Sequence, residues 1–195
     1  MLHHILVVHT HYKIYKPYGY LSQFVNNQNK RRNKKLLSDL FDFSQKTMAI
    51  GRLDEKSEGL LLLTTDGKFS EYIRSANIEK EYHVMVDGII TNNIVNQLKK
   101  GVEISVNSKP YMTKPCKAEI LKDTSHITER FVRDERHGAT SWLSITITEG
   151  KFRQVRKMTS KVGLPTLRLV RVRIGDYKLG NMKPGAYESI SCLHS

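Results

Sequence analysis

The sequence predicts an α+β fold with a mixed, mostly antiparallel sheet. Apolar residues alternate with polar ones in residues 80–88 and 140–148, and the four leucines at 60–63 predict a buried strand. Helical spacing of apolar residues occurs between such segments, at 91–100 and 153–162. Strands and helices interspersed in this way are typical of one layered α+β domain.

The N-terminal part of the chain contains shorter patterns. Residues 5–8 (ILVV) predict a strand, and residues 16–24 (KPYGYLSQF) predict a Pro/Gly turn that runs into another strand. Residues 26–35 contain five basic and no apolar side chains, so both a solvated loop and an electrostatic contact with RNA explain them. The apolar residues within 36–41 have helical spacing.

The middle of the chain contains the expected boundary between two halves. After the leucine strand, residues 68–75 predict a short helix with one apolar face, formed by Phe69, Tyr72 and Ile73. The polar connector 75–80 follows this helix. We therefore expect an N-terminal half at residues 1–76 and a C-terminal half at residues 77–195.

The second half repeats the strand and helix patterns. In the strand at 80–88, Tyr82, Val84 and Val86 share one face, and the helix at 91–100 turns Ile94, Val95 and Leu98 inward before Gly101, a residue that favours helix ends. Residues 122–138 are polar and predict a mobile basic loop, in which Arg130, Arg133 and Arg136 are explained either as phosphate contacts or as solubilising charge. In the strand at 140–148, the apolar face consists of Leu143, Ile145 and Ile147.

The last two elements follow a turn at Glu149–Lys151. In the helix at 153–162, Val155, Met158 and Val162 face inward, and Arg153, Arg156 and Lys157 lie on the polar side. Gly163 and Pro165 end this helix. The strand TLRLVRVRIG (166–175) changes its apolar phase between Leu169 and Val170, which predicts a bulge or a twist there.

Charge and cysteine content restrict the class of partner. The chain has 195 residues, of which 32 are Lys or Arg and 19 are Asp or Glu, so its formal net charge is +13. This charge suits a polyphosphate such as nucleic acid, although it also fits a basic protein without such a partner. Only Cys116 and Cys192 occur, and neither has metal-ligand spacing, so we expect no zinc site and no disulfide framework. The sequence predicts neither a signal peptide nor a membrane span, which favours the cytoplasm.

One carboxylate occupies a position that suits catalysis. Asp54 follows an arginine in GRLD and precedes the leucine strand, so a stiff turn holds it. No P-loop, G-x-G-x-x-G or G-x-S-x-G motif occurs, and Asp54 is too close in sequence to Glu55 and Glu58 for a glycosidase pair. An aspartate that acts on a buried base must stay ionised, which requires a cation, and Arg156 is the best candidate. On the residues alone, an ordinary ion pair explains these two side chains better than catalysis does.

Taken together, the motifs resemble one enzyme family. GRLDEKSEGLLLLTTDG, KEYHV, EGKFRQVRKM and LVRVRIGDYKLGNMKPG, with KPYGYLSQF, are similar in type and order to those of bacterial ribosomal pseudouridine synthases related to the small-subunit enzyme. The resemblance runs from about Lys16 to Ile190. It implies the pseudouridine synthase fold, with two halves, flanking helices and a central active-site cleft. KPYG begins at residue 16, which leaves no room for the S4-type domain of most relatives.

The resemblance also implies roles for individual residues. Asp54 matches the catalytic aspartate, which attacks the target nucleoside while the base is detached, rotated and rejoined through C5. Tyr82 matches the tyrosine that stacks on the uracil and is a candidate to take the C5 proton, and Arg156 matches the basic partner of the aspartate. Arg52 matches an arginine that helps to extrude the uridine. Leu169 is expected to line the pocket, although core packing explains a leucine at that point equally well. We add Arg153, Lys157, Arg130 and Arg133 as expected contacts with the RNA backbone.

Together with TSWLSIT and VGLPTLRLVR, the compact form resembles the large-subunit members of this family, which modify 23S rRNA. The resemblance therefore implies isomerisation of a uridine in a stem-loop region of 23S rRNA. The enzyme is expected to act as a monomer, in the cytoplasm, without a metal or cofactor, because isomerisation requires no co-reactant. The alternative is a non-catalytic rRNA-binding factor in ribosome assembly. Asp54, Tyr82 and Arg156 together argue against this alternative, because a protein that only binds RNA has no need of all three.

Overall fold

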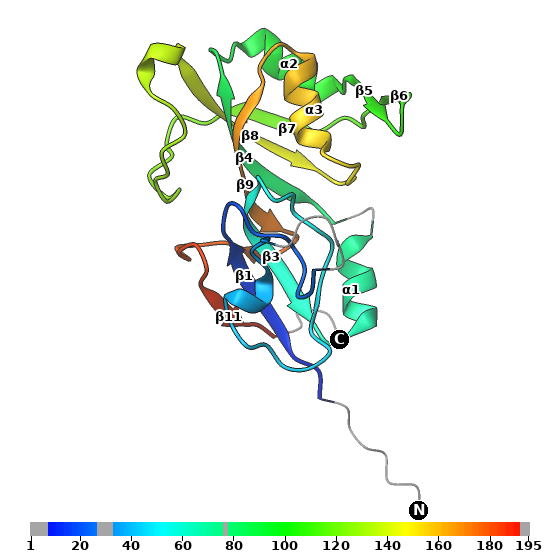
Figure 1. Ribbon diagram of the computed structural model, residues 1–195. Coiled ribbons are helices and arrows are strands. Elements are labelled where there is room, and N and C mark those ends of the chain that lie inside the picture. The colour runs from blue at the N-terminus through cyan, green and yellow to red at the C-terminus, as the bar shows by residue number, and fades with distance from the viewer. Residues whose placement is uncertain (1–7, 27–32, 76–77, 192–195) are drawn as a thin grey trace, which may run out of the picture.

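The computed structural model describes residues 8–26, 33–75 and 78–191, and within them one nine-stranded sheet runs the length of the molecule (Figure 1). The strand order is β11-β1-β3-β9-β4-β8-β7, with β10 beside β9 and β2 beside β3. These strands are β1 (His11–Lys16), β2 (Met48–Ala49), β3 (Glu58–Thr64), β4 (Lys80–Asp87), β7 (Lys117–Ile120), β8 (Thr140–Ile147), β9 (Thr166–Ile174), β10 (Tyr177–Lys178) and β11 (Tyr187–Ser189).

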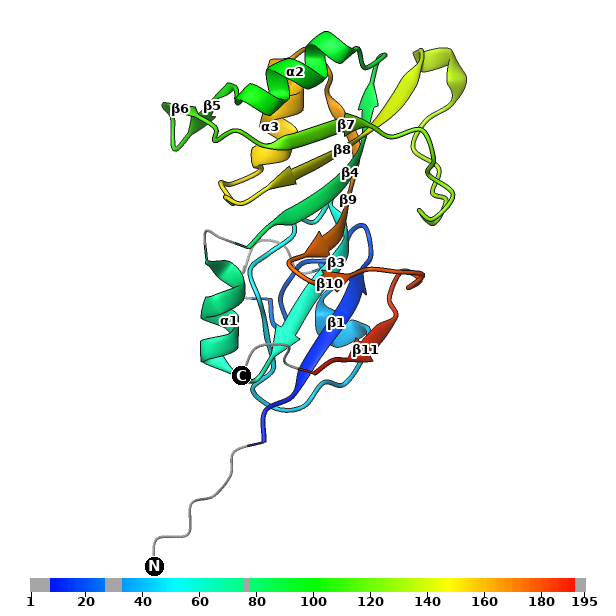
Figure 2. The same cartoon turned by 180° about the vertical axis from the view of Figure 1, so that it is seen from behind.

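The other elements lie beside this sheet. A separate hairpin is formed by β5 (Glu103–Val106) and β6 (Lys109–Met112). The helices are α1 (Gly67–Arg74), α2 (Asn92–Lys100) and α3 (Gln154–Lys161), with short 3-10 turns η1 (Leu37–Asp39) and η2 (Glu135–His137). In Figures 1 and 2, α1 lies with β1, β3 and β11 in one half, while α2 and α3 lie with β4, β7 and β8 in the other.

Strand β9 connects the two halves. It pairs in parallel with β3 on one side and antiparallel with β4 on the other, and β3–β9 is the only parallel pair among the described strands. The prediction of a mixed, mostly antiparallel α+β sheet is therefore confirmed. The division at residues 76 and 77 remains a prediction, although β11 returns to pair with β1 in the first half.

The leucine strand is buried on both faces. Leu60 and Leu62 pack with Phe69 of α1, while Leu61 and Leu63 pack with Ile14 and Leu37 on the opposite face. Because both faces are covered, the strand reads as a continuous apolar run instead of an alternating one. The predicted buried strand is confirmed, and its stiffness fixes the turn that precedes it.

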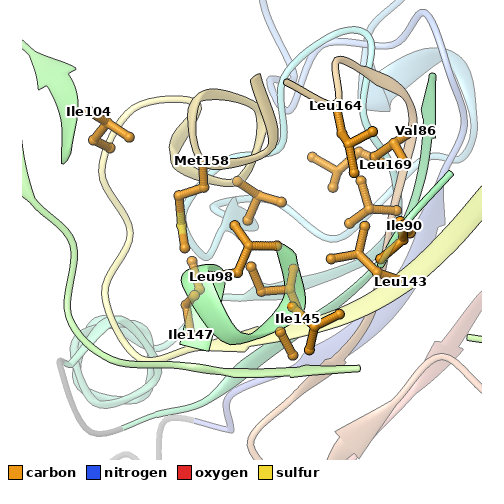
Figure 3. Close-up of a cluster of buried hydrophobic side chains, with 14 residues drawn as sticks. Val86, Ile90, Leu98, Ile104, Leu143, Ile145, Ile147, Met158, Leu164 and Leu169 are labelled. Atoms are coloured by element: carbon orange, nitrogen blue, oxygen red, sulfur yellow. The ribbon is translucent and has the colours of Figure 1, made fainter. Parts of the chain in front are cut away.

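The core of the second half confirms the predicted faces of β4, β8, α2 and α3. Figure 3 shows this cluster, in which side chains of β4 and β8 face those of α2 and α3. Val84, Ile145, Leu98 and Met158 are almost completely buried in it. Burial of each such side chain stabilises the fold by about 1.5–3 kcal/mol. This core holds β4 and α3, which both contribute to the cavity described below.

The first half departs from two predictions, and two others fall largely outside the described residues. The predicted strand at 5–8 stays a prediction, because only Val8 of it is described and Val8 belongs to no strand; the first strand among the described residues is β1. Residues 16–24 form the expected turn but no second strand, because only an isolated bridge joins Tyr20 to Lys35. The helical spacing at 36–41 produces only the 3-10 turn η1. Of the basic segment, residues 27–32 lie outside the described residues.

Two further predictions need correction, and three strands were missed. Tyr72 does not share the buried face of α1 with Phe69 and Ile73, since it is 40% exposed. No bulge occurs between Leu169 and Val170, which pair regularly with β4; the phase changes there because these two residues are buried on opposite faces of the sheet. The register instead shifts on either side of this regular stretch. Strands β5, β6 and β7 were not predicted, because most of their residues are exposed and lack alternation.

Candidate functional site

A cavity of about 520 Å³ lies where the two halves meet. Its walls come from the turn before β3, the start of β4, the loop after β8, the first turn of α3 and the middle of β9. Five residues predicted from the sequence line it: Arg52, Asp54, Tyr82, Arg153 and Leu169.

The turn that carries Asp54 is held at both ends. Before it, the Ser22 hydroxyl donates to the Leu53 carbonyl oxygen and accepts from the Leu53 amide, each at 2.9 Å. Within it, the Ser57 amide donates to the Asp54 carbonyl oxygen at 2.9 Å. After it, Gly59 has a φ of +100°, and a Cβ there would collide with the Arg171 backbone on β9. These constraints fix the backbone from which the Asp54 side chain projects, and this side chain is 30% exposed.

Two arginines face Asp54: Arg153 at the N-cap of α3 and Arg156 within the helix. The Nε atoms of Arg153 and Arg156 each lie 3.9 Å from Asp54 Oδ2. Arg156 is the more enclosed, with 11% of its side chain exposed, and its Nη2 donates to the Lys56 carbonyl oxygen at 2.7 Å and to Ser57 Oγ at 3.2 Å. Burial lowers the pKa of Arg156, and the Asp54 carboxylate opposes this effect. An arginine stays protonated under such conditions, so Asp54 faces a permanent cation.

Arg153 reaches this position through an unusual backbone conformation. It is the N-cap of α3 and has a φ of +53°, in the left-handed region. A non-glycine residue in this region is strained, and such strain often marks a functional position. Helix α3 accordingly begins at Gln154, one residue later than the predicted 153.

Tyr82 and Leu169 form an apolar wall of the cavity. They lie on the adjacent strands β4 and β9, and both contact the core of the second half. Tyr82 is half-buried, so part of its ring is open to the cavity. A half-open aromatic side chain beside a carboxylate can hold a planar base by stacking.

Glu149 organises the loop between β8 and α3. Its carboxylate accepts hydrogen bonds from the Tyr111 hydroxyl, the Lys114 amide (2.8 Å) and Gln154 Nε2 (2.7 Å). Burial raises the pKa of Glu149, but these hydrogen bonds outweigh it and hold the pKa below its usual value. The ionised carboxylate therefore ties the β5–β6 hairpin and α3 to the rim of the cavity.

Several cations at or near the cavity were not predicted as site residues, among them Lys80, Arg171 and Lys16. Lys80 and Arg171 line it from β4 and β9, and Arg171 is buried with its Nε donating to the Leu60 carbonyl oxygen at 2.8 Å. Arg171 Nη2 is also buried and has no hydrogen-bond partner among the described residues. Lys16 is completely buried behind the site, and its ammonium donates to the carbonyl oxygens of Pro17 (2.9 Å) and Tyr20 (2.7 Å). Lys16 and Lys80 stand in the KPYG and KEY motifs, which were the only signal available.

The remaining predicted RNA contacts lie outside the cavity. Lys157 faces the β5–β6 hairpin, with its Nζ 2.6 Å from the Ser105 carbonyl oxygen. Arg130 stacks on Tyr18 at 4.2 Å and approaches the buried Glu58 at 3.4 Å. Arg133 forms a two-bond ion pair with Asp87, at 2.6 and 3.0 Å. The structure thus brings Arg153 to Asp54, whereas Lys157, Arg130 and Arg133 do not line the cavity.

A metal site is absent from the part of the chain that the structure describes, since no three side chains of His, Cys, Asp or Glu gather there. Among the same residues, no helix is long and apolar enough to span a membrane.

Comparison with known proteins assigns the family. Residues 10–161 match the family described as RNA pseudouridylate synthase. The chain belongs to this family. The match covers more than half of the chain and includes the Asp54 turn, Tyr82 and α3, so this synthase is an isomerase that acts on RNA.

Individual relatives agree with this assignment. The synthase is 42% identical to the "Ribosomal large subunit pseudouridine synthase E" of Vibrio parahaemolyticus, over 90% of this chain and 71% of the relative. It is 40% identical to the protein of the same name from Xanthomonas axonopodis pv. citri, over 87% of each. Its fold is similar to a crystal structure of a pseudouridylate synthase, with a TM-score of 0.75 and 26% identity over 96% of this chain and 72% of that one.

The buried Lys16 gives the synthase a pH-dependent stability. Burial lowers the pKa of Lys16 from 10.5 to about 8, although Glu58 and Asp54 oppose this shift. Between these two values the unfolded chain binds more protons than the folded one, so the free energy of unfolding rises with pH. Between pH 8 and pH 9.5, the free energy of unfolding of the unchanged synthase should therefore rise by about 1–2 kcal/mol relative to that of Lys16→Met.

Urea unfolding at several pH values measures this gain. Lys117→Met, which removes an exposed ammonium, controls for the loss of one positive charge. Stability curves for Lys16→Met and the unchanged synthase that stay parallel across this range would contradict the prediction.

Proposed function

We propose that the synthase isomerises one uridine of 23S rRNA to pseudouridine, as a monomer in the cytoplasm and without a cofactor. The observation that carries the proposal is Asp54 in a cavity with two arginine Nε atoms 3.9 Å from its carboxylate and an aromatic wall. The choice of large-subunit RNA is supported by the names of the relatives that share 39–42% of its residues.

In this proposal Asp54 is the nucleophile. Its carboxylate projects from a fixed turn, is open to the cavity and lies beside the cation of Arg156, an arrangement that suits covalent catalysis. Attack at the uracil ring and attack at the ribose are both open to it. The base detaches, rotates and is rejoined through C5, the bond between Asp54 and the nucleoside breaks so that the carboxylate is regenerated, and the C5 proton leaves. Tyr82 is proposed to stack on the uracil and to accept this proton, with Leu169 as the apolar support.

The rim residues are proposed to move the uridine into the cavity. A base in a stem must leave its stack before chemistry, which costs a few kcal/mol. Arg52 is exposed and lines the opening, so it can fill the space that the flipped uridine leaves. Arg153 and Lys157 offer cations for the neighbouring phosphates, which would repay part of the cost.

Tritium release tests the proposal directly. Pseudouridine formation frees the hydrogen on C5, so an rRNA fragment tritiated at uridine C5 should release label in a single turnover. Mapping of pseudouridine in 23S rRNA from cells that lack the protein should then show one missing site. RNA binding without label release would instead support the non-catalytic assembly factor, which family membership and the assembled Asp54, Tyr82 and Arg156 disfavour.

The salt dependence of binding tests Arg130 and Arg133 as RNA contacts. Both already pair with carboxylates, of Glu58 and Asp87, so each has only part of its charge to offer. The double variant Arg130→Ala, Arg133→Ala is expected to bind the rRNA fragment more weakly and to lower the slope of log K against log salt by up to about 2. An unchanged slope would remove these two residues from the interface.

A further inference from the structure

The turn that leads into α3 presents an exposed aromatic ring at the rim of the cavity. Phe152 is 70% exposed, whereas its neighbours Lys151 and Arg153 both line the cavity. A single exposed phenylalanine is common on protein surfaces and indicates nothing alone. Whether Phe152 has a role in binding depends on the surface beside it.

A second hollow, of about 860 Å³, lies directly beside this turn. We call it the α3 groove, because it runs between α3 and the β5–β6 hairpin. Its lining contains one acidic residue, Glu103, and five basic ones: Lys109, Arg153, Arg156, Lys157 and Lys161. A concave surface with this excess of positive charge attracts a polyanion.

The α3 groove adjoins the cavity that contains Asp54. Arg153 lines both hollows, and Arg153 and Arg156 are the residues that face Asp54 at 3.9 Å. A strand whose flipped nucleotide occupies the cavity can therefore enter the groove with its neighbouring nucleotide.

Lys157 lines the α3 groove and also lies over the Phe152 ring. Its Nζ lies 5.5 Å from the centre of the Phe152 ring and donates to the Ser105 carbonyl oxygen of β5. The ring and a cation of the groove wall are thus close enough for one nucleotide to contact both. An aromatic platform beside a basic groove is the arrangement by which proteins hold single-stranded nucleic acid.

We propose that Phe152 stacks on the base next to the flipped uridine, while the α3 groove binds the phosphates of that strand. This inference rests on the proposed function, since it assumes an RNA substrate. Flipping removes a stacking partner from the neighbouring base, and the Phe152 ring replaces that partner. Stacking on a ring is tolerant of base identity. The contact therefore supplies affinity and geometry, and contributes little to the choice of sequence.

The affinity of Phe152 variants for an rRNA stem-loop fragment tests the proposal. Stacking of one base is worth about 1–3 kcal/mol, so Phe152→Ala should raise Kd about 5- to 150-fold. Phe152→Trp should restore tight binding, and Phe152→Leu, which is apolar but lacks an aromatic face, should not. Because Phe152 is exposed, none of these variants should change thermal stability. Ile89→Ala is the control, since Ile89 is also exposed but follows the far end of β4.

Abasic substrates identify the stacked base. Two fragments are compared, one without the base on the 5′ side of the target and one without the base on its 3′ side. One of these two fragments should bind the unchanged synthase more weakly than the complete fragment does. Phe152→Ala should be insensitive to the same deletion, because the ring and the base act as one pair. Equal sensitivity of the unchanged synthase and Phe152→Ala to both deletions would overturn the proposal, as would an unchanged Kd for Phe152→Ala.

The groove has its own test. Lys109→Ala and Lys161→Ala should each lower the salt slope of binding by about 1, and unchanged slopes for both would refute the phosphate track. These outcomes are distinct from failure of the proposed function. If the unchanged synthase forms no pseudouridine in any 23S fragment, the substrate assignment fails; if it does but Phe152→Ala binds normally, only the present inference fails.

Discussion

Changing Asp54 to asparagine is expected to slow single-turnover pseudouridine formation by about 10⁴-fold or more. Asparagine has nearly the same shape, but its neutral amide is a poor nucleophile. The two arginines lie 3.9 Å from Asp54 Oδ2, which is too long for a hydrogen bond, and the carboxylate is partly exposed. The change should therefore leave folding intact and RNA affinity within about threefold.

Glu55→Gln is the matched control for this variant. It makes the same chemical change one residue further along, at a carboxylate that pairs with Lys34 at 2.6 Å and does not line the cavity. Tritium release should be nearly normal for Glu55→Gln. Normal turnover by Asp54→Asn would sink the assignment of Asp54 as nucleophile, because no neighbouring carboxylate lines the cavity in its place except Glu149, whose oxygens already accept three hydrogen bonds.

The parts of the fold that the sequence predicted are those whose burial leaves a regular pattern. The leucine run became β3, and β4, β8, α2 and α3 present the expected faces. Strand β1 was missed because its buried end, Ile14 to Lys16, includes a lysine. Short exposed strands such as β5 and β6 also carry no periodic signal. Pairing with distant strands, which local sequence does not specify, decides these cases.

The site shows the same division. Asp54, Tyr82 and Leu169 were assigned from motifs, and the structure brings them to one cavity. The buried cations Lys16 and Arg171 were not assigned, because a charged residue in a strand is expected to face solvent. Their burial arises where the two halves meet, a feature of tertiary structure. The α3 groove could not be predicted either, because one of its walls is formed by β5 and β6, which were not predicted.

Arg156 is expected to have the second largest effect on turnover. Its guanidinium supplies the enclosed cation opposite Asp54 and also holds the turn through the Lys56 carbonyl oxygen and the Ser57 hydroxyl. Removing one preorganised electrostatic group from an active site commonly costs about 10²–10³ in rate. Arg156→Ala should lose this amount. Arg156→Lys should lose less, because an ammonium keeps the charge. It should still be slower than the unchanged enzyme, because an ammonium cannot contact both Asp54 and the turn as a guanidinium does.

A purely structural role for Arg156 makes a different prediction. Arg173 provides the comparison, since it pairs with Glu79 and Glu81 at 3.0 and 2.9 Å and lies outside the cavity. Arg173→Met should lower the free energy of unfolding but leave the rate of the folded enzyme unchanged, whereas Arg156→Ala should lower the rate at temperatures where it is fully folded. Added guanidinium ion should partly restore Arg156→Ala, because it can occupy the vacated site beside Asp54. A loss of rate that only tracks the loss of stability would show that Arg156 supports the turn without serving the chemistry.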